Sequence, residues 1–290
     1  MNPNAIEIRG LTKSFRKFRL GPLDLTVPRG SIYGFVGPNG AGKTTTLDLL
    51  LGMGSPEGGR ILVDGLDHAR DEVAVKQRIG YVSPDLDFRM WGKIGKAIRF
   101  VRGFHRGWDD RHCGQLLQTF RLGLDDSIAT LSYGSKIKLA LVLALAWRPS
   151  ILILDEPTVG LDAVARHDLY SELLETVRDE DRTVLISTHA LGDVERFADH
   201  LGFIKDGRML LEGGTAELLQ RYRMVDCQTS DPVRLRNQPG VLIARNDGNR
   251  LRVLVDRGEQ SGDWLQQCGA QALFSAPVTL EELFITLAKD

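Results

Sequence analysis

The sequence has few cysteines and no long hydrophobic run. Its 290 residues contain three cysteines, Cys113, Cys227 and Cys268, which are far apart and show no metal-ligand spacing. This sparse set argues against a disulfide framework and fits a reducing cytoplasm. The most apolar run, Leu139–Trp147, is much shorter than the roughly 20 residues that cross a bilayer. If the protein serves a membrane, we therefore expect the membrane-spanning part in another chain.

A charge excess of one sign and an export signal are also missing. Lysine and arginine total 37 against 38 aspartate and glutamate residues, so the formal net charge is −1. No general attraction to nucleic acid or to an anionic membrane is expected from that balance. Met1–Gly10 is polar and lacks the apolar core of an export signal. A cytoplasmic location is therefore expected.

Strand and helix patterns alternate along the first two thirds of the chain. Ile151–Leu154 is fully apolar, as in the buried strands of parallel sheets. Helices are expected at Gly42 to about Leu51 and at Ala163–Arg178. This alternation predicts an α/β layer fold with a parallel sheet. The other expected strands are Ala5–Arg9, Leu23–Val27, Ser31–Val36, Arg60–Val63, Arg78–Val82 and Thr183–Ser187.

The composition changes after about Gln220, which predicts a small separate α+β domain. We expect a main domain at 1–220, with a helix-rich part at about 86–146, and an accessory domain at 221–290. Thr279–Glu282 has the pattern of a capping box that opens a last helix to Ala288. The other expected elements are strands Met224–Gln228, Val241–Arg245 and Leu251–Val255, a turn at Asp247-Gly248-Asn249, and a helix at Ser261–Cys268.

A glycine-rich loop after the strand Ser31–Val36 predicts phosphate binding. Gly37–Thr44 matches the pattern G-x-x-x-x-G-K-[ST], with a strand before it and a helix after it. Glycines let the backbone curl so that several N–H groups, and the positive end of the next helix, face phosphate oxygens. Lys43 is placed to reach the β- and γ-phosphates, and the Thr44 hydroxyl to bind Mg²⁺. The candidate nucleotide-binding residues are Gly37, Asn39, Gly40, Ala41, Gly42, Lys43, Thr44 and Thr45.

Two acidic residues follow the apolar strand Ile151–Leu154. Asp155 and Glu156 stand at the carboxyl end of a buried strand, where α/β sheets place their ligands. We expect Asp155 to hold Mg²⁺, and Glu156 to orient and deprotonate the attacking water. Together with the loop, these residues predict ATP hydrolysis.

Three further motifs complete a recognisable series. Leu131–Ser135 precedes Asp155 by about one helix, Gly160–Asp162 follows Glu156, and Thr188-His189 follows another expected strand. In this order the five motifs resemble the nucleotide-binding subunit of ATP-binding cassette (ABC) transporters, over about Ile6–Gly214. The resemblance implies a P-loop NTPase of the ABC type, with a mixed sheet core, an antiparallel β subdomain and a helical subdomain. It also implies an ATPase with ATP and Mg²⁺ as cofactors.

The resemblance implies roles for several residues. His189 would contact the γ-phosphate, and Asp162 would lie in a loop that bridges two subunits. Ser132 and Gly134 would contact the γ-phosphate of the ATP held by a partner subunit. Phe15 stands where the family stacks an aromatic ring on adenine, although a core position is an equal alternative.

The sequence departs from the family pattern at two places. The usual Leu-Ser-Gly-Gly-Gln signature reads Leu-Ser-Tyr-Gly-Ser at 131–135, so Tyr133 adds bulk and Ser135 shortens the last side chain. Pro84 stands where the family has a glutamine near the metal. We hypothesise that Ser83 or Asp85 replaces that glutamine; an Asp85→Ala variant with unchanged hydrolysis and coupling would dismiss Asp85.

The expected function is that of the ATP-hydrolysing subunit of an ABC transporter. It would pair with a second nucleotide-binding subunit, as a homodimer or heterodimer, and drive separate membrane permease subunits from the cytoplasmic face of the inner (plasma) membrane. Pro277–Phe284 and Leu20–Val27 resemble the family branch that serves exporters, which favours export over import.

Two alternatives stay open from the sequence. One is a soluble ABC-type ATPase that acts on ribosomes or DNA, and the other is a complex that signals without transporting. Phe88–Trp108 mixes aromatic and basic residues, a composition that also occurs in nucleic-acid sites. We rank docking onto a membrane subunit first for this stretch, a solvated basic face second and nucleic acid last.

Overall fold

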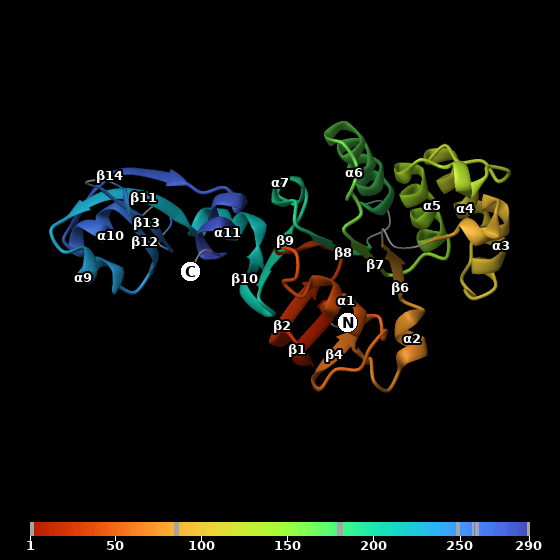
Figure 1. Cartoon of the computed structure of the whole chain (residues 1–290), viewed down its shortest axis with the longest axis horizontal. Helices are drawn as coiled ribbons and strands as arrows, with labels where there is room; N and C mark the ends of the chain where they lie inside the picture. The colour runs from red at the N-terminus through yellow and green to blue at the C-terminus, as the bar shows by residue number, and fades with distance from the viewer. Residues whose placement is uncertain are drawn as a thin grey trace. The chain divides into compact units, whose positions relative to one another are not determined.

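The computed structural model describes residues 3–83, 87–178, 182–247, 250–256, 258 and 261–288 (Figure 1). The chain forms two compact units, one of residues 1–189 with 204–209 and one of residues 190–203 with 210–290. The boundary expected at residues 220 and 221 stays a prediction. Across the described ranges, no helix has the length and apolar character that crossing a membrane requires.

An antiparallel sheet opens the first unit. Its strand order is β2-β1-β4-β5. Alternating apolar residues bury one face, including Ile6, Ile8 and Leu25. Its strands are β1 (Asn4–Phe15), β2 (Phe18–Pro28), β4 (Gly58–Val63) and β5 (Leu66–Asp67). The first strands expected from the sequence are confirmed, and both extend to a tight turn at 16–17.

A second sheet holds the parallel strands of the unit. Its order is β10-β9-β3-β8-β7-β6, and β3–β8, β8–β7 and β7–β6 pair in parallel. Every residue of β3, β7 and β8 is buried, which fits the largely apolar sequences of β3 and β7 and the apolar centre of β8. The strands are β3 (Ile32–Val36), β6 (Ile79–Val82), β7 (Ile151–Asp155), β8 (Thr183–Thr188), β9 (His200–Lys205) and β10 (Arg208–Gly214). The predicted α/β class is confirmed.

Helices follow the parallel strands, and α3, α4 and α5 gather in one group (Figure 1). Ser132 caps α5, whose apolar residues are largely buried. The helices of the unit are α1 (Lys43–Leu50), α2 (Glu72–Lys76), α3 (Ile94–Arg102), α4 (Asp110–Thr119), α5 (Tyr133–Leu145) and α6 (Ala163–Arg178), with 3-10 turns at Arg89–Trp91 and Ile128–Thr130. The helix-rich region expected at about 86–146 therefore contains α3, α4 and α5.

The second unit contains a four-stranded antiparallel sheet of order β12-β13-β11-β14. Val225, Val253 and Leu265 belong to its core. The elements are α7 (Leu191–Val194), α8 (Thr215–Arg221), β11 (Arg223–Thr229), α9 (Pro232–Arg236), β12 (Val241–Asp247), β13 (Arg250–Val255), α10 (Ser261–Gln267), β14 (Ala270–Pro277) and α11 (Leu280–Ala288).

The local signals in this unit are largely confirmed. The backbone N–H of Glu282 donates to Oγ1 of Thr279 over 3.1 Å, and the N–H of Thr279 donates to Oε2 of Glu282 over 3.0 Å, as a capping box requires. Asp247 pairs with Arg250 across the hairpin, and Gly248 and Asn249 lie outside the described residues. The strand β14 has no counterpart in the sequence analysis, because a register shift beside Cys227 interrupts its alternation.

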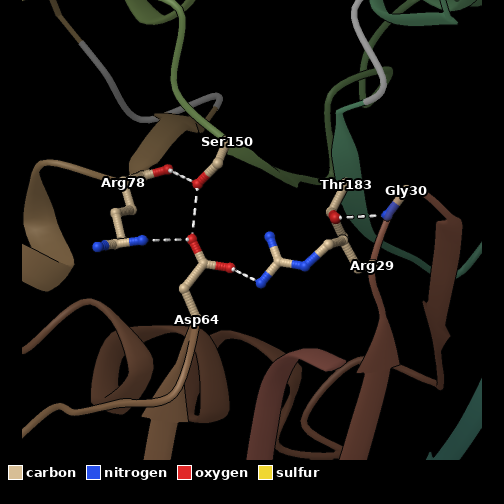
Figure 2. Close-up of polar contacts among 6 residues, drawn as sticks. All are labelled: Arg29, Gly30, Asp64, Arg78, Ser150 and Thr183. Carbon is tan, nitrogen blue, oxygen red and sulfur yellow. Dashed lines mark hydrogen bonds and ion pairs between the residues drawn. The ribbon is translucent and has the colours of Figure 1, made fainter. Parts of the chain in front are cut away.

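A polar cluster ties the antiparallel sheet to the beginnings of the parallel strands (Figure 2). Asp64, between β4 and β5, has a side chain that is only 3% exposed. Its Oδ1 accepts a hydrogen bond from Arg29 over 2.6 Å, and its Oδ2 accepts from Arg78 over 3.0 Å and from Ser150 over 2.9 Å. Burial alone would raise the pKa of Asp64, but these hydrogen bonds outweigh it and lower that pKa below 3.8. The cluster therefore fixes where β3, β6 and β7 begin.

Candidate active site

The loop Gly37–Thr45 curls around the ammonium group of its own lysine. Lys43 is 6% exposed, and its Nζ donates to the carbonyl oxygen of Gly37 over 2.7 Å and to that of Pro38 over 3.3 Å. The loop lies between β3 and α1, whose N-cap is Gly42. The strand, loop and helix expected from the sequence are all present, so the lysine stands at the N-terminus of α1.

Two glycines of the loop are required by close packing. A Cβ atom on Gly37 would lie 2.3 Å from the carbonyl oxygen of Ile204, which no side chain tolerates. Gly42 has a φ of 109°, and a Cβ there would lie 2.9 Å from Cζ of Phe18. Glycine is therefore needed at position 37 because of the neighbouring backbone, and at position 42 chiefly because of the left-handed φ.

Asp155 ends β7 and lies against the hydroxyl group that follows Lys43. Thr44 Oγ1 donates to Oδ2 of Asp155 over 3.2 Å. Desolvation raises the pKa of Asp155, while the hydroxyl groups of Ser187 and Thr44 lower it less strongly. Ser187 lies near enough to act on this pKa, but neither its Oγ nor Oδ1 of Asp155 makes a hydrogen bond of good geometry. A buried carboxylate oxygen is thus left for a further ligand.

Glu156 reaches both Lys43 and His189 from a left-handed backbone conformation. Its φ is 45°, which is uncommon for a residue other than glycine and marks a constrained position. Its Oε1 lies 3.3 Å from Nζ of Lys43, and its Oε2 lies 2.9 Å from Nδ1 of His189. Its backbone N–H donates to the carbonyl oxygen of Ser187 over 2.9 Å. The ends of β3, β7 and β8 therefore bring these three side chains together.

The signature residues lie at the start of α5 in the same unit. Ser132 caps α5, and its Oγ accepts from the backbone N–H of Ser135 over 3.1 Å and lies 2.9 Å from Oγ of Ser135. Within the described part of the chain, no hydrogen bond or ion pair joins Ser132 or Gly134 to residues 37–45. Pro84 and Asp85, where the sequence departs from the family, lie outside the described residues.

Sequence reasoning missed one aromatic residue at this site. Phe15 and Phe18 flank the β1–β2 turn with ring centroids 6.3 Å apart. Phe15 is 52% exposed, which does not fit a core position, whereas Phe18 is half-buried beside Gly42. The sequence places Phe15 and Phe18 on either side of a two-residue turn, and this spacing could have identified Phe18. Side chains at paired positions of a hairpin lie close together, so a site near one of them is also near the other.

An aromatic cluster lies on the surface of the helical region. Trp91 stacks on Phe100 with ring centroids 3.9 Å apart, and Phe100 meets Phe104 edge-on at 4.9 Å. Phe104 is 62% exposed and Met90 is 80% exposed. Lys93 and Arg102 form ion pairs with Asp125 and Asp110, which reduces the basic character of this stretch.

Comparisons with known proteins agree with this geometry. A family model described as ABC transporter matches residues 20–159. The chain is 30% identical over 283 residues to the ABC transporter ATP-binding protein YtrB of Bacillus subtilis, which covers 97% of each chain. It is 33% identical to the Nod factor export ATP-binding protein I of Burkholderia lata, over 97% of this chain and 96% of that protein. The chain belongs to the ABC transporter ATP-binding proteins.

A solved structure agrees with the family assignment. The protein cbiO1 of Clostridium perfringens, part of the ABC transporter complex cbiONQ, superimposes with a TM-score of 0.66 and 25% identity. The superposition covers 75% of this chain and 91% of that one. The family expected from the five motifs is confirmed, and as an ABC transporter ATPase the subunit binds and hydrolyses ATP.

Proposed function

We propose that this ABC transporter subunit uses residues 37–45, Asp155, Glu156 and His189 to bind and hydrolyse Mg-ATP for export. The observation that carries the proposal is the convergence of Lys43 and His189 on the two carboxylate oxygens of Glu156, at 3.3 Å and 2.9 Å. Lys43 now donates hydrogen bonds to the carbonyl oxygens of Gly37 and Pro38. A phosphate group bound at the loop would replace these oxygens as the hydrogen-bond acceptor of Lys43. The name of the export relatives favours export.

The site is suited to Mg²⁺ by its oxygen donors. Thr44 Oγ1 and Asp155 supply hard oxygen ligands, and Oδ1 of Asp155 is buried with no hydrogen bond of good geometry. The described residues contain no group of three or more His, Cys, Asp or Glu side chains that would hold a metal alone. Phosphate oxygens and water would complete the coordination, as is usual for Mg²⁺. When bound, the ion neutralises charge that develops on the phosphates.

In the proposed reaction, Glu156 accepts a proton from the attacking water. The water oxygen bonds to the γ-phosphorus, the bond to the β-phosphate oxygen breaks, and ADP and inorganic phosphate leave. Lys43 stabilises the phosphate charge. His189 holds Oε2 of Glu156 and contacts the γ-phosphate. The left-handed backbone of Glu156 fixes the carboxylate before ATP arrives.

A second nucleotide-binding subunit supplies the other half of the proposed site. Among the described residues, no hydrogen bond or ion pair ties Ser132 or Gly134 to residues 37–45 of their own chain, which fits contact with ATP on another copy or on a homologous subunit. Closing and reopening of that pair would drive permease subunits at the cytoplasmic face of the membrane. The aromatic cluster of Trp91, Phe100 and Phe104 is the proposed permease contact.

The proposal is tested by replacing Glu156 with glutamine. Glu156→Gln keeps the size and most hydrogen bonds of the side chain but cannot accept the proton. We expect ATP binding to persist and turnover to fall by about 10²–10⁴-fold, the usual contribution of a general base. Nucleotide binding and phosphate release are measured on the same preparation. Turnover near that of the wild type would contradict the role of Glu156.

A further inference from the structure

The tyrosine that departs from the family signature turns into its own subunit. Tyr133 is the first residue of α5, it is half-buried, and its hydroxyl oxygen is shielded from solvent. A side chain that acted only on a partner's nucleotide would point outward from the end of α5. The burial of this hydroxyl instead indicates an intramolecular contact.

The contact involves the loop that follows Glu156. A Cβ atom on Gly160 would lie 3.9 Å from Cε1 of Tyr133, which is ordinary van der Waals distance. A Cβ on Gly134 would lie 3.6 Å from Cδ2 of Leu161. Tyr133 and Gly134 at the start of α5 therefore lie beside Gly160 and Leu161 of this loop.

The same loop is tied to Glu156 by two backbone turns. The N–H of Val159 donates to the carbonyl oxygen of Glu156 over 3.2 Å, and the N–H of Leu161 donates to that of Thr158 over 3.1 Å. Gly160 lies between them with a φ of 82°, so the loop has little freedom to change shape locally. A displacement at Gly160 would therefore reach Glu156, whose own backbone is already constrained.

We propose that Tyr133 is a positioning residue that links the start of α5 to the Glu156 of the same subunit. The inference rests on the proposed function, in which two subunits enclose ATP. When Ser132 and Gly134 engage the nucleotide of the partner, Tyr133 carries the resulting movement of α5 to the loop 158–161. Each subunit then aligns its own glutamate only after its signature has closed on the other subunit's ATP.

Steady-state kinetics provide the first test. Tyr133→Ala removes the ring, and misplacement of a catalytic group by a fraction of an ångström is expected to lower kcat roughly tenfold to hundredfold. The KM for ATP should stay near the wild-type value, because the loop 37–45 is untouched. Tyr133→Phe keeps the ring and should keep kcat within about twofold. Lys136→Ala, one turn along α5, serves as the matched control.

Mixtures of chains separate a link within one subunit from a contact between subunits. In the first mixture, Tyr133→Ala chains are combined with Glu156→Gln chains. In a mixed dimer, the intact Glu156 and the altered Tyr133 then lie in the same chain, and turnover should be low. In the second mixture, wild-type chains are combined with Tyr133→Ala/Glu156→Gln chains. In a mixed dimer, the intact Glu156 and the altered Tyr133 then lie in different chains, and each intact Glu156 should turn over ATP at the wild-type rate. The reverse pattern, equal loss in both mixtures, or wild-type kcat in Tyr133→Ala would overturn the proposal.

The proposed function fails in a different way. If Glu156→Gln alone hydrolysed ATP like the wild type, the assignment of the hydrolytic site would fall, whatever the Tyr133 variants did. If Glu156→Gln is inactive while Tyr133→Ala raises KM and leaves kcat unchanged, the site stands and the tyrosine acts on the partner's nucleotide instead.

Discussion

Two buried aspartates lie at opposite ends of the same parallel sheet and have opposite surroundings. Asp64, near the beginnings of β3, β6 and β7, receives three hydrogen bonds that bring its pKa below 3.8. Asp155, at the end of β7, receives one good hydrogen bond, and desolvation raises its pKa. The first carboxylate is satisfied by the protein itself, whereas the second keeps a buried oxygen that, in the proposed function, binds the cation that comes with the substrate.

This contrast separates a structural acid from a functional acid without reference to any motif. A buried polar group is normally hydrogen-bonded, and an exception calls for an explanation. At the beginnings of the strands, both carboxylate oxygens of Asp64 accept hydrogen bonds. At their carboxyl ends, Oδ1 of Asp155 lacks a hydrogen bond of good geometry, and Oε1 of Glu156 meets Lys43 in an ion pair without such a bond. In the proposed function, the beginnings of the strands thus carry a stabilising cluster and their carboxyl ends carry the chemistry.

The largest effect is expected on ATP affinity, at the carboxyl ends of the parallel strands. Lys43→Ala removes a buried ammonium group, and a charged hydrogen bond of about 1.5–3 kcal/mol corresponds to a roughly 10- to 150-fold loss of ATP affinity. Turnover should fall further. Lys13→Ala is the control, because Lys13 also donates to a backbone carbonyl, that of Ser55, but at the antiparallel sheet. Equal ATP affinity in the two variants, measured by titration, would contradict the contrast.

The next largest effect is expected on the free energy of unfolding, at the beginnings of the parallel strands. Asp64→Asn leaves Arg29 and Arg78 without a carboxylate, and both arginines reach solvent, so we expect a loss of about 2 kcal/mol rather than the 3–5 kcal/mol of a fully buried pair. Turnover per folded molecule should persist. Denaturant unfolding measures the loss, with Asp67→Asn as the control for an exposed pair. A stable but inactive Asp64→Asn protein would contradict the structural role assigned to Asp64.

The pH dependence of stability should differ between Asp64 and its asparagine variant. Because folding lowers the pKa of Asp64, its carboxylate stabilises the protein above 3.8, the usual value, and this contribution disappears as the pH falls through the lower folded-state pKa. The wild type should therefore exceed Asp64→Asn in stability at neutral pH and approach it in acid. Unfolding curves between neutral pH and pH 3 provide the measurement, and a constant difference would contradict the account.

The smallest expected effect concerns a neutral hydrogen bond in the same region. The Gly30 N–H donates to Oγ1 of Thr183 over 2.9 Å, beside the Asp64 cluster (Figure 2). Thr183→Val keeps the shape but leaves this N–H without its acceptor, which should cost about 1 kcal/mol. Thermal unfolding checks the value. A loss as large as that of Asp64→Asn would show that charge is not what distinguishes this cluster.

The residues at the carboxyl ends of the parallel strands could be predicted from the sequence far better than the Asp64 cluster at their beginnings. Lys43, Asp155 and Glu156 belong to short local patterns, and parallel strands necessarily bring their carboxyl ends to one edge. Asp64 meets Arg29, Arg78 and Ser150 from distant parts of the chain, and no local pattern marks it. The left-handed backbone of Glu156 and the position of Phe18 beside Gly42 were equally hidden, because both arise from tertiary packing.

The most direct test of the contrast compares Asp64→Asn and Asp155→Asn in thermal unfolding with and without Mg-ATP. A ligand at a hundredfold excess over Kd stabilises by about 2.7 kcal/mol, or roughly 5–10 °C for a domain of this size. We expect Asp64→Asn to unfold at a lower temperature but keep this upward shift. Asp155→Asn should unfold at or above the wild-type temperature, because a raised pKa means that the charge opposes folding, and it should lose the shift. A destabilised Asp155→Asn protein that still responds fully to Mg-ATP would contradict the account.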